Sequence, residues 1–363
     1  MVITELRLQD FRNYTRLSLS LETGLSVFWG GNAQGKTNLL EAVHVCCLGK
    51  SHRTVQSAEM VSYGKKDARI GLRVARADGP RHIQGMLEAN RHKRISVSGV
   101  PIRRMSELMG HVQCVLFAPE DLQLIKGGRS LRRRYLDTAL CQMSPAYFSA
   151  LTRYNAALSQ RNAMLKRGIE EAAIYEAYEQ TMAQAGAEVL WHRQQFCREI
   201  QPLAQLYADI AEGEQMQACY RSQVPEGDRA EIEAALAALL ANAREADRRR
   251  YMTSVGPHRD DVEVSIAGKP ARSYASQGQQ RTAVLALKLA EVERMRARTG
   301  HRPVLMLDDV LSELDLKRQQ ALTEQVEGQV LLTTATKPPK HLKASCVQGI
   351  PRRNYGIKAP GRP

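Results

Sequence analysis

A glycine-rich loop occupies residues 30–37 and reads GGNAQGKT. It matches the pattern G-x-x-x-x-G-K-[ST], in which glycines let backbone N–H groups surround a phosphate, the lysine reaches the β- and γ-phosphates, and the hydroxyl can bind Mg²⁺. The apolar run LSVFW precedes the loop, and a helical apolar pattern follows it. The sequence therefore predicts a site for a nucleotide and Mg²⁺ formed by Gly30, Gly31, Asn32, Ala33, Gln34, Gly35, Lys36 and Thr37.

Two acidic residues, Asp308 and Asp309, end the apolar run VLML. Such a run is typical of a buried parallel strand, and an acid at its carboxyl end lies at the edge of the sheet where nucleotides bind. We therefore expect Asp308 to be the carboxylate on the Mg²⁺ side and Asp309 to polarise the attacking water. A strand that merely runs into an acidic turn is the structural alternative, and the phosphate-loop pattern elsewhere in the chain weakens it.

A second candidate anion site is the helix start in SYASQGQQRTAV, with Ser276, Gln277, Gly278 and Gln279. Backbone N–H groups at a helix N-terminus attract anions. This helix start would either bind a different anion or meet the same nucleotide from the far side, which requires a second subunit. An ordinary capped helix is the alternative.

The elements that must position these residues fall into blocks. Strand-like alternation dominates the first part of the chain, a helical pattern runs from about residue 144 to 250, and strand patterns return at VEVSI. No apolar heptad is sustained, so long coiled-coil arms are not expected. We predict an N-terminal head part at 1–117, a helical lobe at 118–249, a C-terminal head part at 250–336, and a flexible basic tail at 337–363.

The formal net charge of +14 favours a polyanionic partner, nucleic acid before membrane, although a soluble protein can simply be basic. The seven cysteines form no C-x-x-C pair, which suggests reduced thiols. The charged N-terminus is unlike a secretory signal, and no apolar run is long enough to span a bilayer. We expect a cytoplasmic protein.

Several stretches resemble known ATPases. ASQGQQR resembles the signature motif of ABC-type ATPases, and SELD at 312–315 resembles their D-loop. PEDLQLIKGGRSLRRRYLD, SVGPHRDDVEV and LDDVLSELDLKRQQAL resemble the RecF family, which is related to SMC and Rad50 heads, and the likeness runs from ITELRLQDFRNY to QVLLTTAT. The resemblance implies an α/β fold: an ABC-type P-loop ATPase head with an inserted, mostly helical lobe.

The same resemblance implies a function. Two heads would sandwich two ATP molecules with Mg²⁺, and Ser276–Gln279 of each would complete the partner's site. Lys36, Asp308 and Asp309 would make the protein a weak, DNA-stimulated ATPase that uses ATP as a switch for dimerisation. It would bind gapped, single- or double-stranded DNA and, with RecR and through it RecO, help to load the recombinase in gap repair, replication restart and SOS induction. An SMC- or Rad50-like DNA-tethering ATPase and a transporter ATPase subunit are the alternatives.

The sequence departs from these families at several positions. Asp309 stands where ABC-type ATPases generally have glutamate, and this shorter acid suggests slow hydrolysis. The switch histidine of transporter ATPases is absent from LLTTATKPP. Arg129 replaces the proline usual in the RecF arginine motif. Glu120 is a candidate for the Q-loop role.

Further polar residues have two open interpretations each. Four basic residues could lie on one helix face and follow a phosphate backbone, or they could form ion pairs with acids of the lobe. They are Arg129, Arg132, Arg133 and Arg134. Arg12 or Asn13 of FRNY could touch the nucleotide, and a plain turn is equally consistent. GPHRDD, with His258, invites a metal-site interpretation, but a structural loop is preferred.

Overall fold

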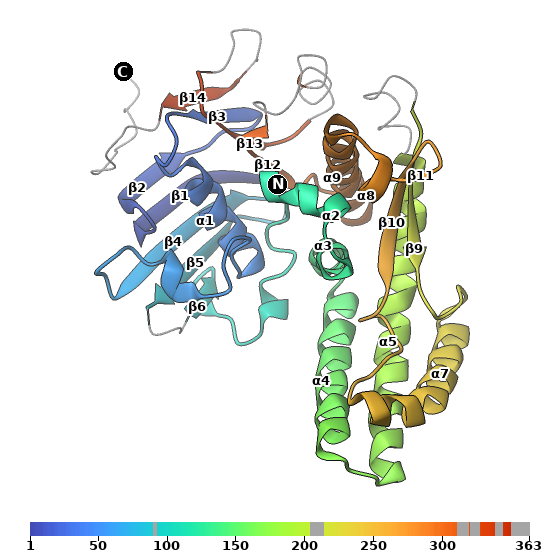
Figure 1. Ribbon diagram of the computed structural model, residues 1–363. Coiled ribbons are helices and arrows are strands. Elements are labelled where there is room, and N and C mark those ends of the chain that lie inside the picture. Colours follow the sequence, from blue (N-terminus) through green and yellow to red (C-terminus); the bar gives the residue numbers. More distant parts are fainter. Residues whose placement is uncertain (90–92, 204–213, 311–318, 320–326, 338–343, 350–363) are drawn as a thin grey trace. The chain divides into compact units, whose positions relative to one another are not determined.

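In a computed structural model, the described residues are 1–89, 93–203, 214–310, 319, 327–337 and 344–349. The chain divides into two compact units, Met1–Asp121 with Glu291–Pro363, and Leu122–Ala290 (Figure 1). The first boundary lies close to the predicted residue 118. The return to the first unit lies at Glu291 rather than at the predicted residue 250, because strand β10 (Asp261–Ile266) pairs with β9 (Met216–Arg221) of the lobe.

An antiparallel sheet forms one layer of the first unit. Its strand order is β2-β1-β4-β5-β6-β7, and neighbouring strands pair antiparallel. Side chains alternate between buried and exposed along β1 and β4, as expected of strands with one face in the core. The strands are β1 (Val2–Phe11), β2 (Tyr14–Ser20), β4 (Asp67–Ala75), β5 (Arg81–Glu88), β6 (Lys93–Val97) and β7 (Val100–Pro101).

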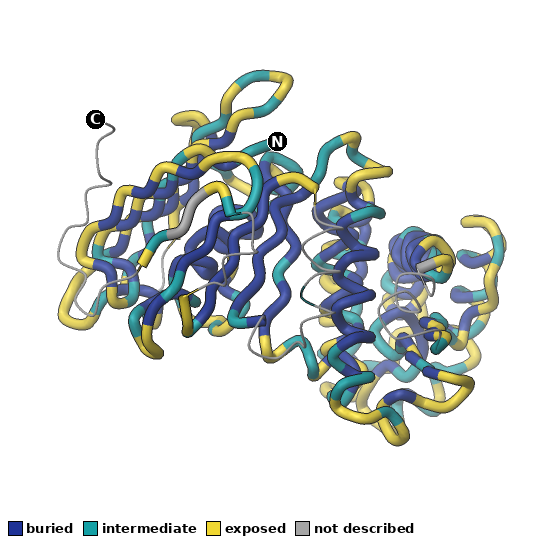
Figure 2. The backbone as a smooth tube through the Cα atoms, turned by 90° about the horizontal axis from the view of Figure 1, so that it is seen from above, coloured by how far each residue is buried: buried dark blue, intermediate teal, exposed yellow. Residues whose placement is uncertain are grey.

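A parallel sheet forms the second layer, in the order β14-β3-β13-β12-β8. Every residue of β12 and β13 is buried, which explains the apolar runs VLML and VLL with which these strands begin (Figure 2). Because these strands are parallel, β3, β12 and β13 end at one edge of the sheet. The strands are β3 (Leu25–Trp29), β8 (Cys114–Phe117), β12 (Val304–Asp308), β13 (Val330–Thr334) and β14 (Cys346–Gly349).

Strand β14 falls within the range 337–363 that the sequence predicted to be a flexible tail. Its four residues, Cys346–Gly349, pair with β3 in the parallel sheet. This part of the range is therefore a strand rather than the predicted flexible tail. Residues 338–343 and 350–363 lie outside the described residues.

Helix α1 (Lys36–Leu48) connects the two layers. It packs against β4 and β5 of the antiparallel sheet and against β8, β12 and β13 of the parallel sheet. All its residues from Leu39 to Leu48 are buried, as expected of a helix enclosed on all sides. This helix starts directly after the glycine-rich loop, so the core of the unit fixes the loop's position. Short 3₁₀ turns complete the unit: η1 (Ser57–Met60), η2 (Met105–Glu107) and η3 (Pro119–Leu122).

The second unit is built on a helical hairpin of α4 (Pro145–Arg167) and α5 (Ala172–Ile200), on which α7 (Arg229–Arg250) packs. Helix α4 starts at a Ser144 cap and ends at Gly168, whose φ of 66° suits glycine. The other elements are α2 (Gln123–Lys126), α3 (Arg129–Met143), η4 (Gln201–Leu203), β9, β10, β11 (Lys269–Pro270), α8 (Ala271–Tyr274) and α9 (Gln277–Thr299), which continues into the first unit.

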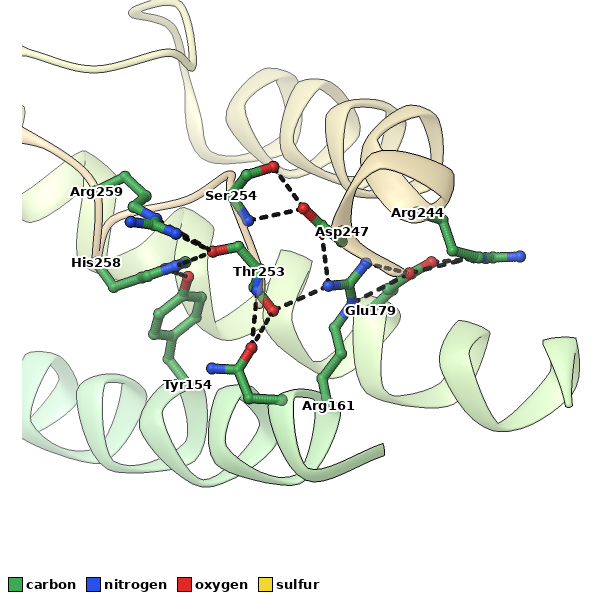
Figure 3. A network of polar contacts seen from close by, with 10 residues as sticks. Tyr154, Arg161, Glu179, Arg244, Asp247, Thr253, Ser254, His258 and Arg259 are labelled. Atoms are coloured by element: carbon green, nitrogen blue, oxygen red, sulfur yellow. Dashed lines mark hydrogen bonds and ion pairs between the residues drawn. The ribbon is translucent and has the colours of Figure 1, made fainter. Parts of the chain in front are cut away.

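A fully buried arginine joins the three long helices to the following loop (Figure 3). Arg161 donates to Asp247 Oδ2 at 2.7 Å, to Glu179 Oε1 at 3.0 Å and to Thr253 Oγ1 at 2.9 Å. Such a charge is stable in the interior only while its carboxylates and hydrogen bonds remain in place. The network therefore specifies how α4, α5 and α7 pack.

The GPHRDD segment is part of the same region. His258 Nδ1 lies 2.6 Å from the Tyr154 hydroxyl, and Arg259 Nη2 donates to the Thr253 carbonyl at 2.8 Å (Figure 3). Burial lowers the pKa of His258 to about 4, so its ring is neutral near pH 7. Asp260 accepts a bond from Tyr220 at 2.6 Å. Within the described residues, no group of three or more His, Cys, Asp or Glu side chains could hold a metal.

Candidate functional site

The glycine-rich loop joins the end of β3 to the start of α1, as the sequence predicted. Gly35 has a φ of 102°, and a Cβ placed on it would lie 2.5 Å from Asn13 Nδ2. Asn13 in turn donates to the Gln34 carbonyl at 3.0 Å. Both backbone conformation and space therefore require glycine at position 35.

Lys36 lies inside the curve of this loop. Its Nζ donates to the carbonyls of Gly30 and Gly31, at 2.8 Å each, and the side chain is buried. The helix cap at Gly35 provides no side-chain oxygen for the first N–H groups of α1, and the first turn holds no acid. A buried cation beside uncapped backbone donors is an environment suited to an anion such as a phosphate.

Two hydroxyl groups converge on Asp308 at the edge of the parallel sheet. Thr37 Oγ1 donates to Asp308 Oδ1 at 3.0 Å, and Thr333 Oγ1 donates to the same oxygen at 2.6 Å. The structure thus brings the two predicted metal-side residues together from α1 and β12. Thr333, at the end of β13, was not predicted as a site residue, although it belongs to the LLTTAT stretch that lacks the switch histidine.

Asp309 follows β12 with a φ of 52°, a left-handed conformation that is uncommon for a residue with a side chain. Its backbone N–H lies 3.0 Å from Thr333 Oγ1 and 3.1 Å from the Thr333 carbonyl, which holds the turn. Backbone strain of this kind is concentrated at functional sites. The D-loop stretch at 312–315 lies outside the described residues.

Arg12 is bonded to Glu41 of α1 and to the η1 turn. Its guanidinium donates to both carboxylate oxygens of Glu41, at 2.9 and 2.7 Å, and to the Glu59 carbonyl at 2.6 Å. Burial would raise the pKa of Glu41, but hydrogen bonds from Arg12 and Ser51 and the charges of Arg12 and Arg53 lower it overall. Arg12 therefore braces α1 from the side, and its neighbour Asn13 is the FRNY residue that contacts the loop.

The segment SHR at 51–53 also lies along α1, and sequence reasoning missed it. Ser51 Oγ donates to Glu41 Oε1 at 2.5 Å, and Arg53 Nη1 donates to Asn38 Oδ1 at 2.9 Å. The sequence feature that could have indicated this segment is three polar residues shortly after Gly49, which caps the C-terminus of α1 in the left-handed conformation. Glu120, the Q-loop candidate, is exposed on η3.

The predicted signature residues form the start of α9 in the second unit. Ser276 Oγ accepts from the Gln279 N–H at 3.2 Å, and Gln279 Oε1 accepts from the Ser276 N–H at 2.7 Å. This reciprocal pair is a helix-capping arrangement, which is the structural alternative considered for this stretch. Ser276 and Gln277 are exposed, so they remain accessible to a ligand.

The four arginines of α3 do not form one exposed face. Arg132 is buried and pairs with Asp261 at 2.6 and 2.9 Å, and Arg133 donates to the Asp260 carbonyl at 2.8 Å. Arg129 is 69% exposed and Arg134 is also exposed. Arg132 therefore agrees with the second interpretation of these arginines, pairing with an acid of the lobe, because its guanidinium is committed to a buried ion pair.

A cleft of about 800 Å³ in the second unit collects arginines that no single sequence motif indicated. Its wall also carries three acids, Asp260, Asp261 and Glu263, so arginines outnumber carboxylates by two to one. This excess makes the cleft a candidate surface for a polyanion. The arginines are Arg129, Arg132, Arg221, Arg250, Arg259 and Arg272.

Within the described part of the chain, no helix is long and apolar enough to cross a membrane. Of the six cysteines whose side chains are described, five are buried, and these six form no disulfide with one another.

Comparison with known proteins agrees with this geometry. The family model RecF/RecN/SMC N terminal domain matches residues 2–354. The DNA replication and repair protein RecF of Alkaliphilus oremlandii is 40% identical over 340 residues, covering 92% of this chain and 93% of the relative. Its counterpart in Symbiobacterium thermophilum is 41% identical over 343 residues, covering 93% and 92%.

Comparison with solved structures leads to the same family. A solved structure of the recombination mediator protein RecF-ATP in the RecFOR pathway is 33% identical, with a TM-score of 0.90 and 97% of each chain covered. An SMC head bound to the C-winged helix domain of ScpA is 14% identical with a TM-score of 0.57, which shows a shared fold alone. The predicted α/β fold of an ATPase head is thereby confirmed. On its sequence and structure, this chain belongs to the RecF family of DNA replication and repair proteins.

Proposed function

We propose that this protein binds ATP with Mg²⁺ at residues 30–37 and Asp308, dimerises on ATP, and binds DNA as a recombination mediator. The observation that carries the proposal is the bond of 3.0 Å between Thr37 and Asp308, which joins the phosphate-loop helix to the acidic strand. The ATP-bound state of the structural relative supports the choice of nucleotide.

The chain's own residues fit a triphosphate. Lys36 and the first N–H groups of α1, which no side chain caps, supply positive potential where the β- and γ-phosphates would lie. Thr37 and Asp308 offer two oxygen ligands, which are the type that Mg²⁺ prefers. A cation held by so few protein oxygens would complete its shell with phosphate oxygens and water, and it would neutralise phosphate charge.

The exposed Ser276 and Gln277 would meet the γ-phosphate of a second copy. A signature motif that completes the partner's site makes the dimer depend on ATP, because only the dimer contacts the γ-phosphate from both sides. Asp309 would orient the attacking water, with slow, DNA-stimulated hydrolysis separating the two copies. Asp309→Asn should therefore keep ATP binding and lower the turnover rate; unchanged turnover would remove Asp309 from this role.

DNA would bind through phosphate contacts to exposed arginines of the 800 Å³ cleft, which are Arg129, Arg221, Arg250 and Arg272. Such binding is steeply salt-dependent and largely independent of sequence. Membership of the RecF family supports gapped DNA as the substrate, and RecR, and through it RecO, as partners. It also supports a role in recombinase loading during gap repair, replication restart and SOS induction.

Light scattering tests the switch. With Mg²⁺, a non-hydrolysable ATP analogue should double the molar mass of the parent protein, and ADP should not. Lys36→Ala and Ser276→Arg should both remain monomeric, but only Lys36→Ala should lose nucleotide binding. A Ser276→Arg variant that dimerises normally would show that this helix start serves its own chain alone.

A further inference from the structure

His52 has both ring nitrogens buried, and neither finds a hydrogen-bond partner among the described residues. A neutral imidazole carries one donor and one acceptor. Leaving a buried donor or acceptor unsatisfied is unfavourable, so an unpaired group of this kind indicates a missing water or ligand.

The position of His52 is fixed by its neighbours in the chain. Ser51 is bonded to Glu41 and Arg53 to Asn38, so both flanking residues are held against α1. The His52 ring packs edge-to-face on His44, with ring centroids 5.2 Å apart and planes inclined at 67°. The ring is therefore held in place by packing, without any hydrogen bond of its own.

The face of α1 that His52 contacts is the face that begins at the candidate cation site. Thr37, Glu41 and His44 follow the spacing i, i+4, i+7, which places them on one side of a helix. Thr37 is bonded to Asp308 at the top of this face. Because Ser51 is bonded to Glu41 and Arg53 to Asn38, which directly follows Thr37, the segment that carries His52 runs back along the first turns of α1 toward the cation ligands.

Three carboxylates act on the ring. Burial lowers the pKa of His52, while Glu41, Asp308 and Glu120 act in the opposite direction and Arg53 adds to the lowering. The ring is thus neutral near pH 7. Asp308 and Glu120 come from β12 and η3 and Glu41 comes from α1, so negative charges of three separate elements act on the ring.

We propose that His52 is a positioning residue of the cation site, whose ring hydrogen-bonds a water molecule coordinating the Mg²⁺ held by Thr37 and Asp308. This inference rests on the proposed nucleotide function. Mg²⁺ usually retains several waters, and protein groups that orient ligands from outside the coordination shell contribute about 10–100-fold to metal affinity. His52 and Glu120 would thereby extend the site beyond its two protein ligands.

The test measures the Mg²⁺ concentration that half-saturates binding of a fluorescent, non-hydrolysable ATP analogue to the full chain. His52→Phe keeps a flat ring against His44 but removes both nitrogens, and should raise this concentration about tenfold or more. Nucleotide affinity in EDTA should equal that of the parent. His44→Phe is the matched control: it removes a neighbouring ring whose Nδ1 already contacts the Lys50 carbonyl, and should leave the Mg²⁺ requirement unchanged.

An unaltered Mg²⁺ requirement in His52→Phe, or an equal rise in His44→Phe, would overturn the inference. If thermal unfolding shows that His52→Phe does not fold, His52→Asn and His52→Gln are tested instead, because their amide groups lie near the positions of Nδ1 and Nε2 respectively. The proposal requires these two variants to differ in Mg²⁺ requirement, and equal values refute it. A parent protein without Mg²⁺-dependent nucleotide binding would instead refute the nucleotide site itself.

Discussion

Thr37 and Asp308 are 271 positions apart in the sequence, yet the Thr37 hydroxyl donates a hydrogen bond to the Asp308 carboxylate at 3.0 Å. The parallel pairing of β12 with β13 and of β13 with β3 produces this meeting, because it aligns the carboxyl ends of the strands. Asp308 also accepts from Thr333, so one carboxylate oxygen joins three elements of the first unit.

Asp308→Asn should weaken Mg²⁺-dependent nucleotide binding at least tenfold while the fold persists. The amide oxygen can still accept from Thr37 and Thr333, but the negative charge that a cation needs is removed. Asp308→Ala instead leaves both hydroxyls without this acceptor and should lower the free energy of unfolding by about 1–3 kcal/mol. Titration with a fluorescent ATP analogue and urea unfolding measure the two effects. Equal Mg²⁺ requirements in parent and Asp308→Asn would contradict the assignment.

Gly35→Ala should abolish tight nucleotide binding and destabilise the protein by about 1–3 kcal/mol, since the new Cβ enters a left-handed backbone and meets Asn13 at 2.5 Å. Gly110→Ala is the control, because Gly110 has a φ of 84° with nothing within 4 Å of its Cβ position. Its cost should be smaller and nucleotide affinity unchanged. Adding Asn13→Ala to Gly35→Ala should recover part of the stability; no recovery would exclude the steric contribution.

Arg12→Ala should cost about 2–4 kcal/mol of stability, because the carboxylate of Glu41 is fully buried and would lose its bidentate partner. The folded state lowers the pKa of Glu41, so the pair's contribution is present above the unfolded value of about 4.3 and is lost as pH falls through the lower folded value. The difference between parent and variant in urea unfolding should therefore shrink below about pH 4. Arg7→Ala, which removes an exposed pair with Glu5, should cost less than about 1 kcal/mol. A difference that grows on acidification would contradict the assigned pair.

Arg129→Ala and Arg132→Ala should separate DNA binding from stability. Both residues approach Asp261, but Arg129 is exposed at 3.7 Å and Arg132 is buried at 2.6 Å. Arg129→Ala should keep the melting temperature and lower the salt slope of DNA binding by about one. Arg132→Ala should leave Asp261 without its main partner and lower the melting temperature by several degrees. Fluorescence anisotropy at several salt concentrations and thermal unfolding distinguish the two; an unchanged salt slope in Arg129→Ala removes it from the DNA surface.

Local sequence patterns were sufficient to predict the elements around the site. The phosphate-loop spacing, the strand before it and the apolar run before Asp308 depend on contacts between near neighbours, and the structure contains all three. Sequence patterns could not decide between two interpretations that depend on the same residues. The spacing of Arg129, Arg132, Arg133 and Arg134 is the same whether a guanidinium faces DNA or Asp261, and Asp261 lies 129 positions from Arg132.

The sequence by itself determined the phosphate-binding loop, the acidic strand end, the helix start at Ser276 and membership of an ATPase family, because each is written in consecutive residues. Only the tertiary structure decided which partner each polar side chain has. Arg12 faces Glu41 and Thr333 faces Asp308 because a buried charge or hydroxyl must find its partner in the folded core, however distant in sequence. His52 lacks such a protein partner among the described residues, and a sequence pattern contains no record of an unpaired nitrogen.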